Sequence, residues 1–325
     1  MNDLLNNVSS NPRFAAAFER LGRVCLNPRR HTAPNARAHS DAVARMAAKL
    51  GRANGCSPAE IALLATLGHA HDIGKITGTA RPARSLEVLA DCGVTDEALL
   101  GLVRWHDTSL PWHRAMRRGE APSDKAWRRL AREVDVRLLC LFMVADRVDA
   151  PAGWRRNAPT IWFHAEARKR GLVDALVLDV DDHPSEISAG AALVGREGGE
   201  PVVLVIRTRR EGWELPKGGL AWDDLPEEAA IRELREEAGV AGELAVSKRL
   251  GELQYPIDGG GERWLKRVCY FVARARGEPS LGDLPKRTHE RRWLREQEVE
   301  GLPLVNEDLR PLLRAALDGE EPWLR

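Results

Sequence analysis

The chain has 325 residues, of which 43% are hydrophobic and 30% are charged, and its net charge is +1. A single hydrophobic core rarely serves a chain longer than about 250–300 residues, so this length favours two domains. The longest strongly apolar run, residues 138–145, is far shorter than the ~20 residues that a membrane-spanning helix needs, so we expect no membrane partner.

Two features of the sequence bear on the cellular compartment. Residues 1–14 lack the basic start and the apolar stretch of a secretory signal. The five cysteines are scattered without a Cys-x-x-Cys pair, which fits reduced thiols better than a disulfide framework. We therefore expect a cytoplasmic protein.

Charge is distributed unevenly along the chain. Residues 1–175 contain 27 Lys and Arg against 18 Asp and Glu, a net charge of +9, whereas the remainder carries −8. The first half should therefore attract polyanions more strongly, although many proteins with a basic surface never bind nucleic acid. An acidic, proline-containing stretch at 180–185 separates a helical pattern from a β-like one, and it predicts domains at 1–180 and 181–325.

The N-terminal half shows helical patterns throughout. Residues 40–50 place apolar side chains at helical spacing. A capping-box pattern at Ser57 and Glu60 starts a second helix, which runs through the string HAHDIGK. A third apolar segment, residues 131–148, reads as one further helix. We therefore predict an all-α bundle whose helices bury one another.

Four residues on these helices form a mixed set of nitrogen and oxygen donors. The set consists of His39 in the first helix, His71 and Asp72 at the end of the second, and Asp146 in the third. Two imidazoles and two carboxylates suit Mn²⁺, Fe²⁺, Co²⁺, Ni²⁺ or Mg²⁺, and such an ion activates water and stabilises charge on phosphoryl oxygens. Each residue alone is more often an ordinary surface or capping residue, but the four together predict a metal site.

The same positions carry a family resemblance. The strings AHSDAVARMAAKL, HAHDIGK and LFMVADRVDA, in that order, resemble the three motif neighbourhoods of the HD-domain phosphohydrolases, over about residues 30–175. The resemblance implies an HD-domain helical bundle in which His39, His71, Asp72 and Asp146 hold a divalent transition metal or Mg²⁺. It also implies that Asp72 is catalytic.

Other candidate contacts in this half are Lys75, His106 and His113. Lys75 resembles a lysine that some family members place beside the phosphate, and its alternative role is a cation that faces a helix dipole. His106 and His113 lie where some members carry histidines for a second metal or for phosphate contacts, so we expect them to line the substrate site. Both follow a tryptophan, however, and packing is the alternative. His31 and His164 are assigned no metal role.

The C-terminal half alternates strand and helix patterns. Apolar, β-branched segments at 189–194 and 201–207 are joined by the turn-rich string GREGGE, which indicates a hairpin. Further strands are predicted at 250–257 and 268–275, and residues 306–317 form a helix. This order is typical of an α/β/α sandwich around a mixed sheet.

Residues 218–240, GGLAWDDLPEEAAIRELREEAGV, form the most informative segment of this half. Glu233, Glu236 and Glu237 stand at i, i+3 and i+4, which places three carboxylates on one helix face. Such charges repel one another unless a cation lies among them, and Mg²⁺ or Mn²⁺ suits oxygen ligands that meet substrate phosphates. The alternative is a solvated, charged surface helix.

A fixed pattern of glycines and charges surrounds these glutamates and resembles the signature of the Nudix hydrolases. Its positions are matched by Gly218, Arg232, Glu233, Leu234, Glu236, Glu237, Gly239 and Val240. The resemblance covers about residues 185–322 and implies a Nudix α/β/α sandwich. It implies Gly218 and the three glutamates as ligands of Mg²⁺ or Mn²⁺, with Arg232 orienting a carboxylate. One departure is Asp224, which stands where the family has glutamate.

Four residues outside this helix are candidates for substrate contacts or proton transfer. Lys217, in the string WELPKGG, resembles a lysine of Nudix members that act on diadenosine and inositol polyphosphates. Lys266 is a second candidate phosphate contact, and Tyr255 either stacks on a base or belongs to the core. Glu290 is an added metal ligand or the general base, or else a plain surface glutamate.

Together these features predict a bifunctional metal-dependent phosphohydrolase. The Nudix domain would cut the pyrophosphate linkage of a nucleoside polyphosphate derivative resembling a dinucleoside polyphosphate, and the HD domain would cut a phosphomonoester or phosphodiester of a nucleotide. One alternative is an enzyme that processes RNA ends, with the HD domain acting on 2′,3′-cyclic or terminal phosphates and the Nudix domain acting on a 5′ cap or polyphosphate. Another is that one module senses nucleotides without turnover, against which the retained glutamates argue.

Overall fold

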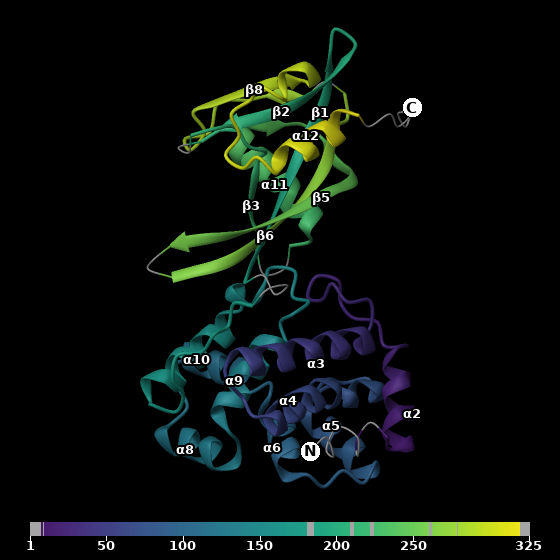
Figure 1. Ribbon diagram of the computed structural model, residues 1–325, viewed down its shortest axis with the longest axis vertical. Coiled ribbons are helices and arrows are strands. Elements are labelled where there is room, and N and C mark those ends of the chain that lie inside the picture. The colour runs from purple at the N-terminus through teal and green to yellow at the C-terminus, as the bar shows by residue number, and fades with distance from the viewer. Residues whose placement is uncertain are drawn as a thin grey trace. The chain divides into compact units, whose positions relative to one another are not determined.

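The chain folds into two compact units, Met1–Ser185 and Glu186–Arg325. The computed structural model describes residues 8, 10–180, 185–208, 211–221, 224–259, 262–277 and 279–318. Figure 1 shows the helical first unit in purple to teal and the sheet-containing second unit in teal to yellow. The domain division expected between residues 180 and 181 falls beside residues outside the described ranges, and it stays a prediction.

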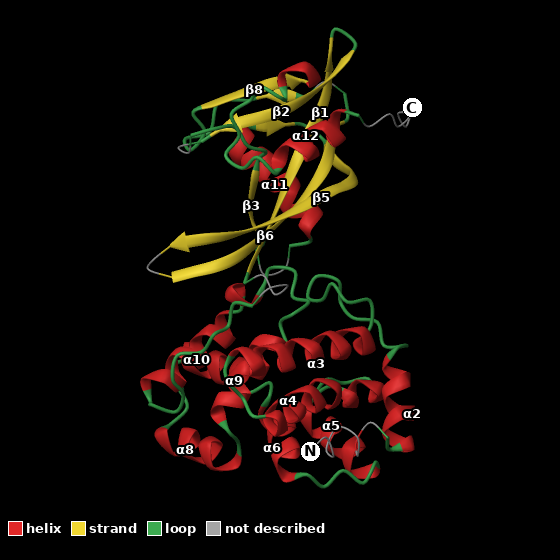
Figure 2. Ribbon diagram, in the orientation of Figure 1, coloured by secondary structure: helices red, strands yellow, loops and turns green. Residues whose placement is uncertain are grey.

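The first unit is all helical, as predicted, and Figure 2 shows its helices in red. Its α-helices are α2 (Pro12–Leu21), α3 (Ala36–Ala53), α4 (Pro58–Ala70), α5 (Pro82–Asp91), α6 (Glu97–Trp105), α7 (Ser109–Arg117), α8 (Asp124–Glu133), α9 (Val136–Ala145) and α10 (Ala158–Lys169). Two short 3-10 helices, η1 (Ile73–Thr77) and η2 (Trp154–Arg156), connect them. The predicted capping box at the start of α4 is confirmed, since Ser57 N donates to Glu60 Oε2 at 2.7 Å and Glu60 N donates to Ser57 Oγ at 3.3 Å.

The helix α9 forms the centre of this unit. All of its residues except Arg137 are buried, which explains why its sequence is apolar on every side. The apolar run at 138–145 is therefore a core segment. In the part of the chain that the structure describes, no helix is long and apolar enough to cross a membrane.

The single helix predicted at 131–148 is wrong, because this segment belongs to two helices. The backbone leaves α8 at Val134, which is extended, and α9 begins after Asp135. The Asp135 carboxylate accepts hydrogen bonds from the amides of Arg137 and Leu138 at 2.8 and 3.1 Å. Asp135 caps the N-terminus of a new helix, so the previous helix has to end before it. The spacing of apolar residues alone did not reveal this break.

Close packing of α3 against α4 brings the first two histidines of the predicted metal site together. Gly68 in α4 faces Ala44 in α3, and a methyl group added at Gly68 would lie 2.3 Å from the Ala44 Cα atom. Only a glycine permits this approach of two backbones. His39 lies in α3, and His71 directly follows α4.

The second unit is built around a mixed sheet with the strand order β5-β6-β1-β2-β8, and β3 also pairs with β1. The strands are β1 (Glu186–Glu197), β2 (Glu200–Arg207), β3 (Lys217–Gly219), β5 (Leu244–Gly259), β6 (Glu262–Ala275) and β8 (Glu290–Arg295), with β4 (Val240–Ala241) and β7 (Ser280–Leu281) forming a separate pair. Strands β1 and β6 are parallel and the other pairs are antiparallel. The predicted hairpin between β1 and β2 is confirmed, with Gly198 and Gly199 at positive φ.

Two helices cover the sheet, α11 (Pro226–Ala238) and α12 (Leu309–Leu317), and η3 (Glu296–Glu298) follows β8. Along β1, Ala192 and Val194 belong to the core cluster that contains Leu313 of α12. The alternate residues Ala191 and Leu193 are also fully buried but lie outside that cluster, and α11 packs against β1 and β3. Because successive strand residues point to opposite faces, the two helices cover opposite faces (Figure 1). The predicted α/β/α sandwich is confirmed.

The contact between α3 and α4 makes a prediction for stability. Replacing Gly68 with Ala inserts a methyl group into the Ala44 backbone, so we expect the free energy of unfolding to fall by about 1–3 kcal/mol, as for other overpacked cores. Urea unfolding followed by far-ultraviolet circular dichroism measures this change. Gly301→Ala is the matched control, because among the described residues no heavy atom lies within 4 Å of its added methyl. Equal midpoints for both variants would contradict the close approach.

Candidate functional sites in the two units

The four residues predicted as metal ligands in the helical unit converge on one buried point. His39 Nε2 lies 3.3 Å from Asp146 Oδ1, and His71 Nε2 lies 3.2 Å from the same oxygen. Asp72 Oδ2 completes the group, at 3.2 Å from His71 Nε2 and 4.0 Å from His39 Nε2. All four side chains are buried. Helix α3 and the ends of α4 and α9 thus deliver two nitrogens and two oxygens to the same place.

The nitrogens of this cluster are oriented as metal ligands would be. His71 Nδ1 lies 2.9 Å from the carbonyl oxygen of Gly68. A carbonyl only accepts hydrogen bonds, so Nδ1 carries a proton, and Nε2 is the nitrogen that can give up its own proton and offer a lone pair to a cation. Within the described ranges, both ring nitrogens of His39 and the Nε2 of His71 are buried without a hydrogen-bond partner, although carboxylate oxygens lie within 3.3 Å of each. The two Nε2 atoms facing two carboxylates fit a divalent cation.

The electrostatics of the cluster lead to the same conclusion. Burial opposes ionisation of Asp72 and Asp146, yet His71 beside the first and Arg147 beside the second hold both pKa values well below the usual range. Burial alone would lower the pKa of His71, but the charges of Asp72 and Asp146 outweigh it and raise that pKa to about 10. The pocket therefore strongly favours positive charge, which a divalent metal supplies with release of protons.

Two of the three other residues predicted here lie at this cluster. Lys75 Nζ lies 2.6 Å from Asp72 Oδ2. The His106 ring contacts the His71 ring, with centroids 5.2 Å apart, while its Nδ1 bonds to the carbonyl of Val103 at 2.7 Å. His113 packs instead against Trp162, with ring centroids 5.9 Å apart. His113 therefore has the packing environment that was the alternative to a site role, whereas His106 lies beside the cluster.

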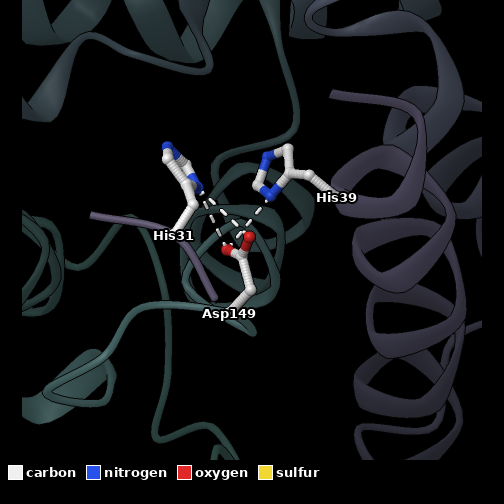
Figure 3. Close-up of side chains that lie close together, drawn as sticks. All are labelled: His31, His39 and Asp149. Atoms are coloured by element: carbon white, nitrogen blue, oxygen red, sulfur yellow. Dashed lines mark hydrogen bonds and ion pairs between the residues drawn. The ribbon is translucent and has the colours of Figure 1, made fainter. Parts of the chain in front are cut away.

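Sequence reasoning missed two neighbours of this cluster, His31 and Asp149. The Asp149 carboxylate lies between His39 and His31, with Oδ1 3.1 Å from His39 Nδ1 and Oδ2 3.2 Å from His31 Nδ1 (Figure 3). His31 received no metal role from its sequence context, and Asp149 follows Asp146 by three residues. The second aspartate after α9, three residues beyond Asp146, was the sequence feature that could have indicated Asp149 as a further site residue.

In the sheet unit, two of the residues predicted as metal ligands, Gly218 and Glu233, lie against each other. Gly218 in β3 faces Glu233 in α11, and a methyl group added at Gly218 would lie 2.2 Å from the Glu233 carboxyl carbon. Glu233 is 6% exposed. The carboxylate thus occupies the space that any other residue at position 218 would fill, which explains the glycine.

Arg232 organises the carboxylates around it. Its Nη1 lies 2.5 Å from Glu233 Oε1 and 3.3 Å from Glu236 Oε2, while Nη2 donates to Asp224 Oδ2 at 3.0 Å and to the carbonyl of Gly219 at 2.9 Å. The planar guanidinium can hold several oxygens in fixed positions. Asp224, the departure from the family pattern, therefore belongs to the arginine network.

The third glutamate is tied to β3 and to a lysine. Glu237 Oε2 accepts a hydrogen bond from the backbone amide of Lys217 at 2.8 Å, and Lys217 Nζ donates to Glu214 Oε2 at 2.6 Å. Burial raises the pKa of both Glu237 and Glu233, although Lys217 and Arg232 oppose the rise. Adjacent carboxylates that resist ionisation are the ligands expected where a cation binds, so the donor set fits Mg²⁺ or Mn²⁺.

A cavity of about 580 Å³ opens beside Lys217. Its lining includes Tyr255 from β5, together with Glu214, Asn306 and Glu307. Lys217 and Tyr255 were predicted as substrate contacts from separate parts of the sequence, and they line the same cavity. Glu214, which is buried beneath Lys217, was missed, although it lies in the same WELPKGG string.

Two predicted residues have other neighbours. Lys266 Nζ lies 3.5 Å from Glu186 Oε1, and the two residues are paired across β6 and β1. Gly218 of β3 pairs with Ala189, three residues further along β1. Glu290 at the start of β8 pairs with Arg207, with Arg207 Nη2 2.9 Å from Glu290 Oε2, and both are exposed. The roles of these two residues stay predictions.

Comparison with known protein families assigns a domain type to each unit. A family model described as the HD domain matches residues 37–150, and one described as the NUDIX domain matches residues 184–316. Both kinds of domain use divalent metals, and together they define a hydrolase that acts on phosphate bonds.

Individual proteins agree with this assignment. The chain is 33% identical over 138 residues to an RNA pyrophosphohydrolase of Sphingopyxis alaskensis, a match that covers 39% of this chain and 87% of that protein. The chain therefore belongs to the Nudix family, with an HD domain preceding its Nudix domain. It is also 43% identical over 102 residues to an RNA pyrophosphohydrolase of Xanthomonas oryzae pv. oryzae, where the match covers 29% of this chain and about half, 49%, of the relative.

A solved structure is similar as well. The Nudix hydrolase RenU of M. smegmatis is 26% identical, with 39% of this chain and 81% of that chain covered and a TM-score of 0.32.

The space at Gly218 gives a prediction for activity. Gly218→Ala would push the Glu233 carboxylate from its position, and a misplacement of about 1 Å lowers turnover on the order of 10²-fold. We expect such a loss in pyrophosphate hydrolysis, with little change in melting temperature, when phosphate release and thermal unfolding are measured together. Gly282→Ala is the control, since its added methyl has its nearest neighbour at 3.5 Å. Wild-type turnover in Gly218→Ala would refute the arrangement.

Proposed function

We propose that the chain carries two separate hydrolytic sites for different phosphate bonds. The Nudix domain would cut the pyrophosphate linkage of a nucleoside polyphosphate derivative, and the HD domain would cut a phosphomonoester or phosphodiester of a nucleotide. The observation that carries the proposal is that the residues of each predicted donor set contact one another or share a neighbour. His39, His71, Asp72 and Asp146 meet at one point. In the Nudix domain, Glu233 faces Gly218, Arg232 contacts Glu233 and Glu236, and Glu237 accepts a hydrogen bond from the Lys217 amide.

In the Nudix domain, Glu233, Glu236, Glu237 and the Gly218 backbone would hold Mg²⁺ or Mn²⁺. Such an ion lowers the pKa of a bound water and stabilises charge on phosphoryl oxygens. Arg232 fixes the carboxylates, one of the three glutamates accepts the proton of the attacking water, and the Lys217 ammonium stabilises charge that develops on the phosphate. Glu290 is less suited to accept that proton, because it is exposed and paired with Arg207.

The cavity beside Lys217 supports a nucleotide substrate. Tyr255 offers a ring on which a base can stack, and Lys217 offers a charge for a phosphate, both at the same cavity. A substrate that resembles a dinucleoside polyphosphate would place its base at Tyr255 and its phosphate chain toward the glutamates.

In the HD domain, the two histidines and two aspartates would hold a divalent transition metal or Mg²⁺. Asp72 would orient a water and Lys75 would meet the phosphate, and the 2.6 Å contact between them supports their sharing one site. His106 lies against His71 and would line the same substrate site.

A second candidate function is the processing of RNA ends. Two observations favour it: the similarity to RNA pyrophosphohydrolases of two bacteria, and the net charge of +9 over residues 1–175. In this case the Nudix domain would remove phosphates from a 5′ polyphosphate or cap, and the HD domain would act on 2′,3′-cyclic or terminal phosphates. Activity on RNA would then fall steeply with added salt.

Single substitutions test whether the two sites are separate. We expect Glu237→Gln to lower pyrophosphate hydrolysis by at least about 10²-fold while HD-domain activity persists, and Asp72→Ala to have the reverse effect. The assay measures phosphate and nucleotide release from dinucleoside polyphosphates, from triphosphorylated or capped RNA, and from cyclic-phosphate RNA. The substrates that are cut distinguish the two candidate functions.

Glu243→Gln is the matched control for this experiment. Glu243 is exposed and pairs only at the surface with Arg276, at 3.1 Å, so its substitution should change neither activity. Loss of one and the same activity in both Glu237→Gln and Asp72→Ala would show that the sites act as one, contrary to the proposal.

A further inference from the structure

The partly buried His31 and the buried Asp149 and His39 form a row of side chains behind the HD-domain cluster. Figure 3 shows the Asp149 carboxylate between the two imidazole rings, and the dashed lines mark its contacts to both. Asp149 is 7% exposed and His39 is 1% exposed. The row adds a carboxylate directly behind one of the four residues proposed as metal ligands.

The two nitrogens of His39 face different carboxylates. Its Nε2 lies 3.3 Å from Asp146 and points into the cluster, whereas its Nδ1 lies 3.1 Å from Asp149 on the opposite side. A neutral imidazole carries one proton. At 3.1 Å the Asp149 carboxylate is close enough to favour the proton on Nδ1, which would leave the lone pair of Nε2 directed into the cluster. Carboxylates in this position orient metal-binding histidines in many proteins and strengthen them as ligands.

Asp149 is itself fixed from the side opposite His39. His31 Nδ1 lies 3.3 and 3.2 Å from its two oxygens. The backbone carbonyl of Asp149 also accepts hydrogen bonds from the amide and the hydroxyl of Thr32, at 2.8 and 3.3 Å. His31 and Thr32, which lie between α2 and α3, thus hold Asp149 in the segment after α9.

We propose that Asp149 is a positioning residue of the HD-domain site, which holds His39 with Nε2 toward Asp146, and that His31 keeps Asp149 in place. This inference rests on the proposed metal site. Its rival is a second cation bound by His31, His39 and Asp149, which together offer three donor atoms within 4.8 Å of one another. Two cations on His39 would require its ring to lose both protons, which favours the positioning role.

The test is a Co²⁺ titration of the full chain, followed by visible absorption. The signal that disappears in Asp146→Ala belongs to the HD-domain site. We expect Asp149→Asn to weaken Co²⁺ binding at this site by roughly 10- to 100-fold, with the same number of ions bound and a shifted absorption band. Asp149→Glu should recover part of the affinity, and His31→Gln should cause a smaller loss than Asp149→Asn.

Asp135→Asn is the matched control, because it removes one negative charge at the other end of α9 and asparagine is an equally good helix cap. Wild-type affinity in both Asp149→Asn and His31→Gln would overturn the positioning role. The positioning role would also be overturned if the wild-type HD-domain site bound two Co²⁺ ions and Asp149→Asn lost one of them while the other kept its affinity. An Asp146→Ala protein that keeps the whole Co²⁺ signal would instead refute the proposed metal site itself.

Discussion

Carboxylates that lie close together and away from water require a compensating positive charge, and both candidate sites depend on this constraint. In the HD domain, Asp72 and Asp146 share one buried pocket and raise the pKa of His71 to about 10. In the Nudix domain, burial raises the pKa of Glu233 and Glu237, and Arg232 supplies a nearby positive charge. A divalent cation resolves the same imbalance in both domains, although one site offers nitrogen and oxygen donors and the other oxygen donors.

Close backbone approach makes both arrangements possible. Gly68 lets α4 approach the Ala44 backbone of α3, which sets the spacing between His71 and His39. Gly218 leaves room for the Glu233 carboxylate against β3. In each case the side chain that is absent matters as much as the ligands that are present, because a single methyl group would occupy the space that the site uses.

Local patterns predicted most of the fold and many residues of the sites. Helical spacing places Glu233, Glu236 and Glu237 on one face without any knowledge of the rest. The meeting of His39, His71 and Asp146 depends on tertiary packing, and it was predicted from their donor types together and from a family resemblance. His31 and Asp149 were missed because 118 residues separate them. Lys266 pairs with Glu186 because of strand register, which no local pattern specifies. The break before α9 was missed because one capping aspartate interrupts two helical patterns that otherwise join.

The central claim is that each domain holds its own divalent metal site. Equilibrium dialysis of the full chain against Mn²⁺ tests it most directly, with His71→Ala and the double substitution Glu233→Gln, Glu237→Gln compared with the wild type. We predict that each variant loses one class of bound ion and keeps the other at wild-type affinity. Loss of all bound ions in either variant, or wild-type binding in both, would contradict the claim.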